Sequence, residues 1–276
     1  MSSTCMRALR RLLSAGCLAA VALSPASADE ADAAIAAAVA GEHRSAEHRA
    51  RDAHRHPAET LRFFGLQPGM KVIEMLPGAD GWYTEILAPV LRDKGLLITE
   101  VLPPRAPPAY AKAQFEGFNK KLDAAPALYD RVERRTLDGS PLVLGPPGSV
   151  DMVLTFRSTH GWIRTAQFDE VYSAIFDVLR SGGILGIEQH RAPDDADVTE
   201  SAKKGYVPQR HLIEQLELIG FELEESAEIN ANPRDTKDYP DGVWTLPPTL
   251  VLGEKDRARY TAIGESDRMT LRFRKP

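Results

Sequence analysis

Residues 70–87 read MKVIEMLPGADGWYTEIL, which combines a mostly apolar run, a turn and the start of a second apolar run. A short apolar run of this kind is typical of a strand that is buried on both faces of a parallel sheet. Pro77, Gly78 and Gly81 then interrupt it, and glycine lets a backbone turn tightly and lets a ligand approach it closely. The apolar spacing that follows predicts a helix over residues 82–91. The unit is therefore strand, turn and helix.

The same alternation extends along the chain. Further strands are predicted over residues 95–102, 131–137, 150–156, 184–188, 221–229 and 268–274, and further helices over 58–65, 109–122, 168–179 and 208–219. Strands that alternate with helices through short turns predict an α/β fold: a Rossmann-like, doubly wound, mostly parallel sheet with helices on both faces. Two longer segments, 191–207 and 230–267, show no clear element and are expected to be lids over a site.

The first 28 residues have the organisation of a signal peptide. Arg7, Arg10 and Arg11 precede an uncharged apolar run over residues 12–23, and small residues then provide a cleavage site that ends at Ala28. The run is shorter than the roughly 20 residues that cross a bilayer, so a membrane anchor is the weaker interpretation. We expect cleavage after Ala28, a periplasmic or secreted location, and no stable membrane insertion afterwards.

The chain that remains after cleavage consists of an N-terminal helical segment, 29–66, and one domain, 67–276. Both cysteines, Cys5 and Cys17, lie in the cleaved part, which excludes a disulfide framework, a cysteine nucleophile and a thiolate metal site from the mature chain. The formal net charge of −5 offers no basic footprint for nucleic acid. A small molecule is the expected partner, and the sequence does not predict an oligomeric state.

Residues 42–56 are dense in arginine and histidine. His43, His48, His54 and His56 are five, six and two residues apart, whereas a helix that binds a metal ion uses spacings of three or four. We therefore interpret residues 29–56 as one helix that lies on the surface or against the domain and ends at Pro57. Its arginines and histidines are expected to form a solvated, charged face, and we predict no metal site.

Polar side chains follow several of the predicted core strands. In an open parallel sheet, a ligand binds beyond the carboxyl ends of the strands. Glu74 and the glycine turn follow the first strand, and Glu100 lies nineteen residues beyond Gly81, where a carboxylate can accept hydrogen bonds from both hydroxyls of a ribose. Either feature alone is weak, but the two in this order favour a ligand that contains a nucleoside.

With these residues, the chain resembles class I S-adenosylmethionine (SAM)-dependent methyltransferases. The further matching stretches are DMVL at 151–154 and LRSGG at 179–183. More narrowly, the chain is similar to a group of exported bacterial methyltransferase-like proteins, through Arg51-Asp52 with Arg55-His56-Pro57, residues 77–89, residues 155–162 and residues 190–192. The resemblance implies a seven-stranded sheet with an antiparallel last strand and SAM as the cofactor. It places the cofactor near Glu74, Gly78, Gly81, Glu100 and Asp138.

The glycine loop departs from the usual methyltransferase pattern. Leu76 and Pro77 stand where the first glycine and its neighbour are common, and Asp80 adds a charge near the expected place of the methionine carboxylate. Two negative charges repel each other, so binding of SAM requires that Asp80 turns outward.

Two histidines follow separate core strands at the ligand-binding end. His160 comes after the fourth strand and His190 after the fifth, with Arg157 and Arg191 beside them. Positive neighbours should hold both imidazoles neutral. Our hypothesis is that His160 is the base or the group that orients the substrate, and that His190 and Arg191 bind an anionic part of it. In the alternative, both histidines only brace their loops.

The predicted function is that of an exported SAM-dependent methyltransferase that acts on an unknown small molecule, with the nucleophile supplied by the substrate. A non-catalytic periplasmic binding or accessory protein on the same fold is the alternative. A nicotinamide-linked oxidoreductase would need a G-x-G-x-x-G turn, which residues 76–81 do not provide.

Overall fold

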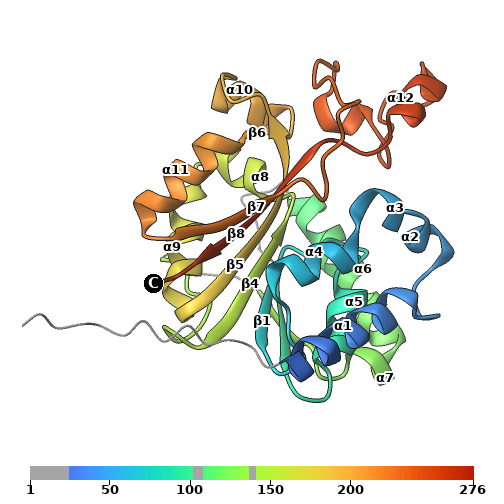
Figure 1. Ribbon diagram of the computed structural model, residues 1–276. Helices are drawn as coiled ribbons and strands as arrows, with labels where there is room; N and C mark the ends of the chain where they lie inside the picture. Colours follow the sequence, from blue (N-terminus) through green and yellow to red (C-terminus); the bar gives the residue numbers. More distant parts are fainter. Residues whose placement is uncertain (1–24, 102–107, 137–140) are drawn as a thin grey trace, which may run out of the picture.

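The computed structural model describes residues 25–101, 108–136 and 141–276. They form one sheet with helices on both faces (Figure 1). The strand order is β3-β2-β1-β4-β5-β8-β7, and a short strand, β6, pairs with the end of β5 off this path. Every pair is parallel except those of β8, which runs antiparallel to β5 and to β7. The predicted fold class is confirmed, and β6 adds an eighth strand.

The elements agree with most of those expected. The strands are β1 (Lys71–Met75), β2 (Leu96–Val101), β3 (Glu133–Thr136), β4 (Val150–Phe156), β5 (Leu179–Ala192), β6 (Val207–Pro208), β7 (Glu222–Ala227) and β8 (Arg268–Arg274). The helices are α1 (Pro25–Ala40), α2 (Ala46–Ala50), α3 (Asp52–Arg55), α4 (Pro57–Phe64), α5 (Thr84–Leu91), α6 (Pro108–Ala124), α7 (Pro126–Tyr129), α8 (Thr159–Arg164), α9 (Phe168–Val178), α10 (Val198–Lys203), α11 (Gln209–Ile219), α12 (Arg257–Ile263) and the short 3₁₀ helix η1 (Gly242–Thr245).

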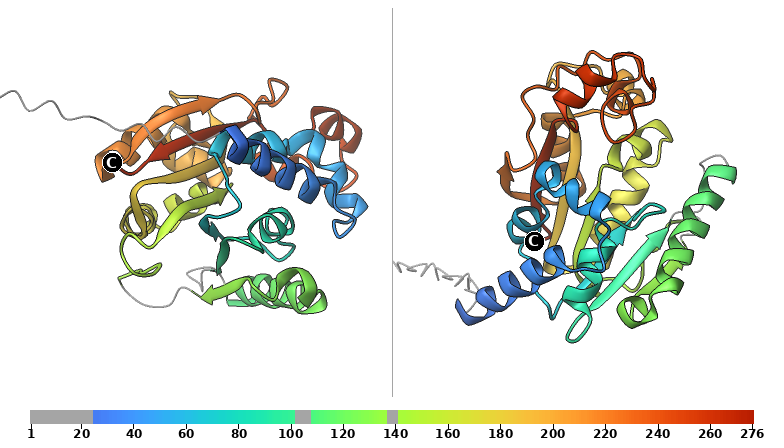
Figure 2. Two further views of the ribbon diagram at one scale, coloured as in Figure 1. Left: turned by 60° about the horizontal axis from the view of Figure 1, so that its bottom comes forward. Right: turned by 90° about the vertical axis from the view of Figure 1, so that its right-hand side faces the viewer.

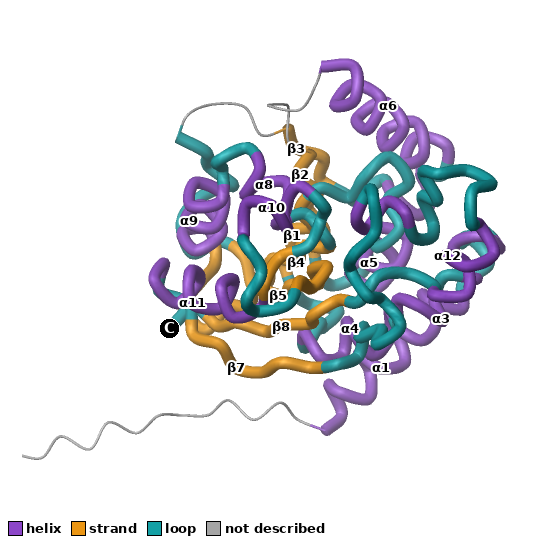
Figure 3. Tube along the Cα trace, turned by 90° about the horizontal axis from the view of Figure 1, so that it is seen from above, coloured by secondary structure: helices purple, strands orange, loops and turns teal. Residues whose placement is uncertain are grey.

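Each face of the sheet has its own apolar layer. Because successive side chains of a strand point to opposite faces, Ile73 belongs to one layer and Val72 to the other. The first layer contains residues of α9 and α11, and the second contains residues of α1, α4 and α5. Figures 2 and 3 show these helices on opposite sides of the sheet. The central strands are therefore covered on both faces, which leaves their carboxyl ends for a ligand.

The carboxyl ends of four parallel strands, β1, β2, β4 and β5, lie together at one end of the sheet. Met75 of β1 pairs with Glu100 of β2 and with Thr155 of β4, and Phe156 pairs with Glu188 of β5. This register brings the residues that follow these positions to one place, which is where parallel α/β folds bind ligands.

The N-terminal segment differs from the predicted single helix. α1 ends at Ala40, and two short helices, α2 and α3, follow before α4 begins at Pro57. Arg44 and Arg55 are only 1% and 5% exposed, so the prediction of a solvated charged face is wrong. The spacing of charged residues can indicate the face of a helix. It does not indicate which residues of other elements pair with a guanidinium group and allow it to be buried.

The two segments expected to lack regular structure contain short elements. α10 and β6 lie in the first of them, and η1 and α12 lie in the second. Figure 1 shows α10, β6 and α12 beyond the same edge of the sheet, above the carboxyl ends of the parallel strands. These segments therefore cover the side of the molecule on which the site is expected.

Residues 1–24, the greater part of the expected signal peptide, lie outside the described residues, and cleavage after Ala28 stays a prediction. Within the part of the chain that the structure describes, no helix is long and apolar enough to span a membrane.

Candidate active site

The loop after β1 keeps a glycine-like conformation at Leu76. Leu76, Gly78 and Gly81 have φ angles of 51°, 73° and 52°. Left-handed backbone costs a non-glycine residue on the order of 1–3 kcal/mol and is concentrated at functional sites. The N–H of Leu76 donates to the carbonyl of Glu100 at 2.9 Å, which ties the loop to the end of β2. Leu76 thus adopts the left-handed conformation that usually favours glycine.

One side of this loop is open. Gly78 and Asp80 are exposed, and a Cβ atom built on Gly78 would meet only the Gln114 side chain, at 3.7 Å. The N–H of Ala79 donates to Oε1 of Gln114 at 2.7 Å, so α6 holds the loop from the other side. The charge of Asp80 lies in solvent, where it is screened, and the backbone of Gly78 is accessible to a ligand.

Glu100 is a buried carboxylate without a hydrogen bond. It has no exposed surface, and among the described residues neither of its oxygens has a hydrogen-bond partner. Arg135 approaches it only to 3.8 Å. Burial raises the pKa of Glu100 to about 7, and the charge of Arg135 opposes this shift. Buried polar atoms are almost always hydrogen-bonded, so this carboxylate is suited to accept two donors from a ligand, as the two hydroxyls of a ribose provide.

Glu74 is also buried, but it has a partner. Thr84 Oγ1, at the start of α5, donates to Glu74 Oε2 at 2.6 Å. Burial raises the pKa of Glu74 to about 7, against the hydrogen bond from Thr84 and the charge of Arg157. Glu74 therefore joins β1 to the helix that follows the loop. Asp138, also predicted near the cofactor, lies outside the described residues.

The structure brings His160 and His190 together. Their ring centroids are 5.9 Å apart, and Trp244 packs edge-on against His160 at 5.7 Å. His160 belongs to α8 and His190 to β5, so separate strand ends converge as expected. Among the described residues, no group of three or more histidine, cysteine, aspartate or glutamate side chains is arranged to hold a metal ion.

Burial is the main reason that both histidines are neutral. It lowers the pKa of His160 to about 4, with Arg164 and Arg157 adding to the shift. The pKa of His190 is lowered well below its ordinary value by burial first, and then by His160 and Arg157. The neutral state was predicted, but arginine charge is only the smaller cause.

A contact with Gln189 favours one position for the proton of the His160 ring, although the same amide nitrogen also donates to the carbonyl of Gly205 at 3.1 Å. The Gln189 side-chain amide can only donate through Nε2, and it lies 3.4 Å from Nδ1 of His160. In a neutral ring, an Nδ1 that accepts leaves the proton on Nε2. His160 therefore presents an N–H donor. A group with a pKa of about 4 is also a poor base at neutral pH, so the geometry favours orientation of the substrate over abstraction of a proton.

Arg191 is already paired. Its guanidinium donates to Glu228 at 2.7 and 2.6 Å and to Asp267 at 3.1 and 3.0 Å. Two carboxylates occupy the face that the sequence assigned to an anionic substrate, so the geometry does not support that role for Arg191. His190 is held through Nδ1, which lies 2.5 Å from the hydroxyl of Ser266.

A third buried carboxylate, Glu188, lies near the end of β5 and was not assigned to the site from the sequence. It receives hydrogen bonds from Arg268 at 2.8 Å, from the hydroxyl of Tyr83 at 2.9 Å and from Arg157 at 3.2 Å. Burial acts to raise its pKa, but the charges of Arg268 and Arg157 outweigh burial and hold the pKa below its ordinary value. Arg157 itself has a left-handed backbone, with φ of 61°.

Glu265 is the matching carboxylate on the other side of Arg268. Arg51 donates to it at 2.8 Å, Arg55 at 3.1 Å and Arg268 at 3.4 Å. Although burial opposes it, these charges lower the pKa of Glu265 to about 2. The antiparallel last strand was expected from the family resemblance, and its start at Arg268 lies beside the end of β5. The expectation of this last strand was the one indication in the sequence that residues 265–268 lie near the site.

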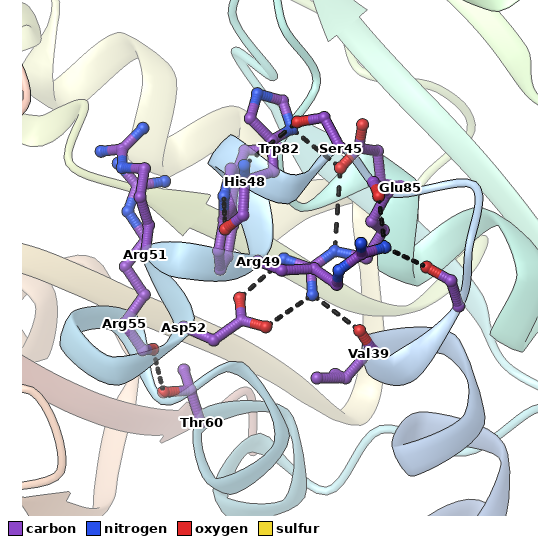
Figure 4. Close-up of polar contacts among 12 residues, drawn as sticks. Val39, Ser45, His48, Arg49, Arg51, Asp52, Arg55, Thr60, Trp82 and Glu85 are labelled. Carbon is purple, nitrogen blue, oxygen red and sulfur yellow. Dashed lines mark hydrogen bonds and ion pairs between the residues drawn. The ribbon is translucent and has the colours of Figure 1, made fainter.

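The N-terminal segment contacts the residues that follow the glycine loop. Guanidinium carbons of Arg44 and Arg55 lie 5.0 and 4.6 Å from the ring centroid of Trp82. His48 Nδ1 lies 2.9 Å from the carboxylate of Glu85. Figure 4 shows His48, Trp82 and Glu85 at this contact. We call residues 43–56 the N-terminal clasp, because they attach to the start of α5.

Comparison with solved structures identifies the fold. The chain superimposes on a SAM-dependent methyltransferase from Aquifex aeolicus with a TM-score of 0.52 and 16% identity, over 66% of this chain and 87% of that one. It superimposes on the cyclase SpnF with a TM-score of 0.57 and 16% identity, over 90% and 93% of the two chains. The fold is that of a SAM-dependent methyltransferase.

The sequence comparisons add no narrower assignment. No family model matches the chain, and no curated protein matches it in sequence. One of these two similar structures is a cyclase, and a shared fold does not by itself decide the reaction. The function has to be argued from the site.

Proposed function

We propose that the protein is an exported SAM-dependent methyltransferase that acts on a small molecule. The observation that carries the proposal is Glu100, whose two buried oxygens have no hydrogen-bond partner among the described residues. It stands at the end of β2, next to the strand that carries the open glycine loop. A ribose diol at Glu100 would fill both acceptor positions, and the accessible backbone at Gly78 would lie beside the rest of the cofactor.

Bound SAM supplies a methyl group activated by its sulfonium, and the nucleophile comes from the substrate. The protein has to align the two and exclude water, which can contribute much of the rate enhancement. In this proposal, His160 donates a hydrogen bond from Nε2 to an acceptor atom of the substrate. The buried surroundings that keep its ring neutral also strengthen that hydrogen bond.

Calorimetry with S-adenosylhomocysteine and SAM tests the proposal, with NAD as the control nucleotide. We expect the folded protein to bind S-adenosylhomocysteine and SAM but not NAD. A ligand at 100 times its Kd adds roughly 2.7 kcal/mol of stability, so thermal unfolding gives a second measurement. Folded protein that binds neither compound at millimolar concentration would contradict the proposal and would favour a fold retained without its cofactor.

A further inference from the structure

The candidate site contains more positive charge than negative charge around two buried carboxylates. The arginine cluster consists of two carboxylates, Glu188 and Glu265, and the four guanidinium groups that contact them, which belong to Arg51, Arg55, Arg157 and Arg268. Glu188 and Glu265 are 0% and 6% exposed, and Arg55 and Arg268 are 5% and 1% exposed. The formal charge of the cluster is +2, and all six groups meet at the carboxyl edge of the sheet.

The neighbouring acidic groups do not compensate this excess. Asp267 is paired with Arg191 and Lys237. Glu74 is bonded to Thr84, and its pKa of about 7 leaves it only partly ionised at neutral pH. The phenol of Tyr83 donates a hydrogen bond to Glu188, and as a neutral group it supplies no negative charge.

An uncompensated buried charge is strongly destabilising. The effect is visible at Arg55, whose pKa is lowered to about 9 by burial first and by the charge of Arg157 next. An anion near these two guanidinium groups would relieve both effects.

The cluster is accessible to a ligand on one side. The side chains of Arg157 and Arg51 are 21% and 20% exposed. Within the described part of the chain, the only side-chain hydrogen bond of Arg157 goes to Glu188, and that of Arg55 goes to Glu265. Each guanidinium has five N–H donors in a planar fork. Several donors on each side chain are therefore available to a ligand.

The position of the cluster connects the two halves of the candidate site. Arg55 packs on Trp82, which directly follows Gly81 of the glycine loop. Arg157 precedes His160 by three residues and contributes to the pKa shifts of both histidines. An anion held by Arg55 and Arg157 would lie between the cofactor loop and the N–H of His160.

We propose that Arg55 and Arg157 bind an anionic group of the substrate, a carboxylate or a phosphate, while His160 orients the atom that accepts the methyl group. The assignment of this group to the substrate rests on the proposed function, whereas the anion site itself does not. Arginine suits this role because its planar donors match the paired oxygens of carboxylate and phosphate. Arg191, which the sequence suggested for this role, is held by Glu228 and Asp267.

The test uses inorganic phosphate and acetate as probes on the full chain, in calorimetry at constant ionic strength with chloride as the reference anion. Arg157→Gln is the test variant, because Glu188 keeps its bonds to Arg268 and Tyr83. Arg62→Gln is the matched control, because among the described residues this surface arginine pairs with Asp32 alone. Arg157→Lys keeps the charge but loses the planar fork.

We expect phosphate or acetate to bind the wild type more tightly than chloride does, and the stronger of the two identifies the anionic group. Arg157→Gln should weaken that binding about tenfold or more, as loss of a charged hydrogen bond does. Arg157→Lys should give an intermediate Kd, and Arg62→Gln should leave the Kd unchanged. No preference over chloride, or an equal loss in Arg157→Gln and Arg62→Gln, overturns the inference.

The same samples separate this inference from the proposed function. If S-adenosylhomocysteine binds but phosphate and acetate do not, the inference fails and the methyltransferase proposal stands. If phosphate or acetate binds in the expected order and S-adenosylhomocysteine does not, the anion site stands and the methyltransferase proposal fails.

Discussion

At the scale of single residues, Glu100 links stability to ligand binding. Burial raises its pKa from 4.5 to about 7, so the folded protein favours the neutral carboxyl. Between these two pH values the unfolded chain has lost the proton and the folded chain has kept it, so the free energy of unfolding falls as the pH rises. The residue proposed to bind the ribose thereby costs the protein stability at neutral pH.

Glu100→Gln should be more stable than the wild type at pH 8, by on the order of 1–3 kcal/mol. The difference should shrink toward pH 5, because the wild-type carboxyl is then protonated too. The same variant should bind S-adenosylhomocysteine about tenfold to a hundredfold more weakly. Urea unfolding and calorimetry measure the two effects, with the exposed Glu59→Gln as the control. Weaker stability at pH 8 together with unchanged affinity would refute the assignment.

His160 allows a donor to be distinguished from a base. If its Nε2–H orients the substrate, His160→Gln keeps an N–H donor and retains part of the turnover, whereas His160→Leu loses about 10²-fold or more. If His160 were a base, both variants would lose turnover equally. Because its pKa is about 4, the rate should also show no ionisation of His160 between about pH 5.5 and 8. Steady-state kinetics and melting temperatures of both variants, with His211→Gln as the control, decide between the two roles.

Residues that follow apolar strands could be predicted, and residues that depend on distant partners could not. Glu100, Gly78 and the histidine pair lie at the carboxyl ends of core strands or just beyond them, and the parallel register brings these ends together. Arg55 contacts Glu265, 210 residues further along the chain. No local pattern marks such a pair, so the arginine cluster was recognised only in the folded protein. No local pattern indicated that Arg191 is paired with Glu228 and Asp267 either, because these residues lie close to it only in the folded protein.

At the scale of elements, the N-terminal clasp is fixed by charge as well as by apolar packing. Arg44 is fully buried and pairs with Asp52 at 2.7 Å and with Glu85 at 3.7 Å. Glu85 also contacts His48 and Lys121, so it joins the clasp to α5 and α6. Helical spacing alone suggested a continuous solvated helix here, because the sequence pattern contains no information about Glu85 as a shared partner.

Arg44→Met should destabilise the protein by about 3 kcal/mol, because Asp52 and Glu85 would lose a buried counter-charge. Hydrogen exchange should accelerate in residues 43–56 more than in the sheet, since the clasp would open before the core does. Arg62→Met, at a surface pair, should change stability by less than about 0.5 kcal/mol. Uniform acceleration across the whole protein would contradict a clasp that opens separately.

At the scale of the whole molecule, the proposed export has a structural consequence at α1. Cleavage after Ala28 would remove only the start of α1, and the side chains that pack against the domain, Ala31, Ile35 and Ala38, would remain. We expect protein from the periplasm or medium to begin at Asp29 and to melt within about 2 °C of the full chain, since exposed ends contribute little stability. Intact-mass measurement showing residues 1–28 still attached would refute this prediction.

The place of β8 in the sheet has a consequence for how the protein is made. β8 is the last strand along the chain, yet it pairs with β5 on one side and β7 on the other. In a nascent polypeptide that still lacks residues 268–274, β7 therefore has no partner strand and one edge of β5 is unpaired. Exposed strand edges favour association with other chains. Most of the sheet can form on the ribosome, but β7 can join it only after translation has passed Arg274.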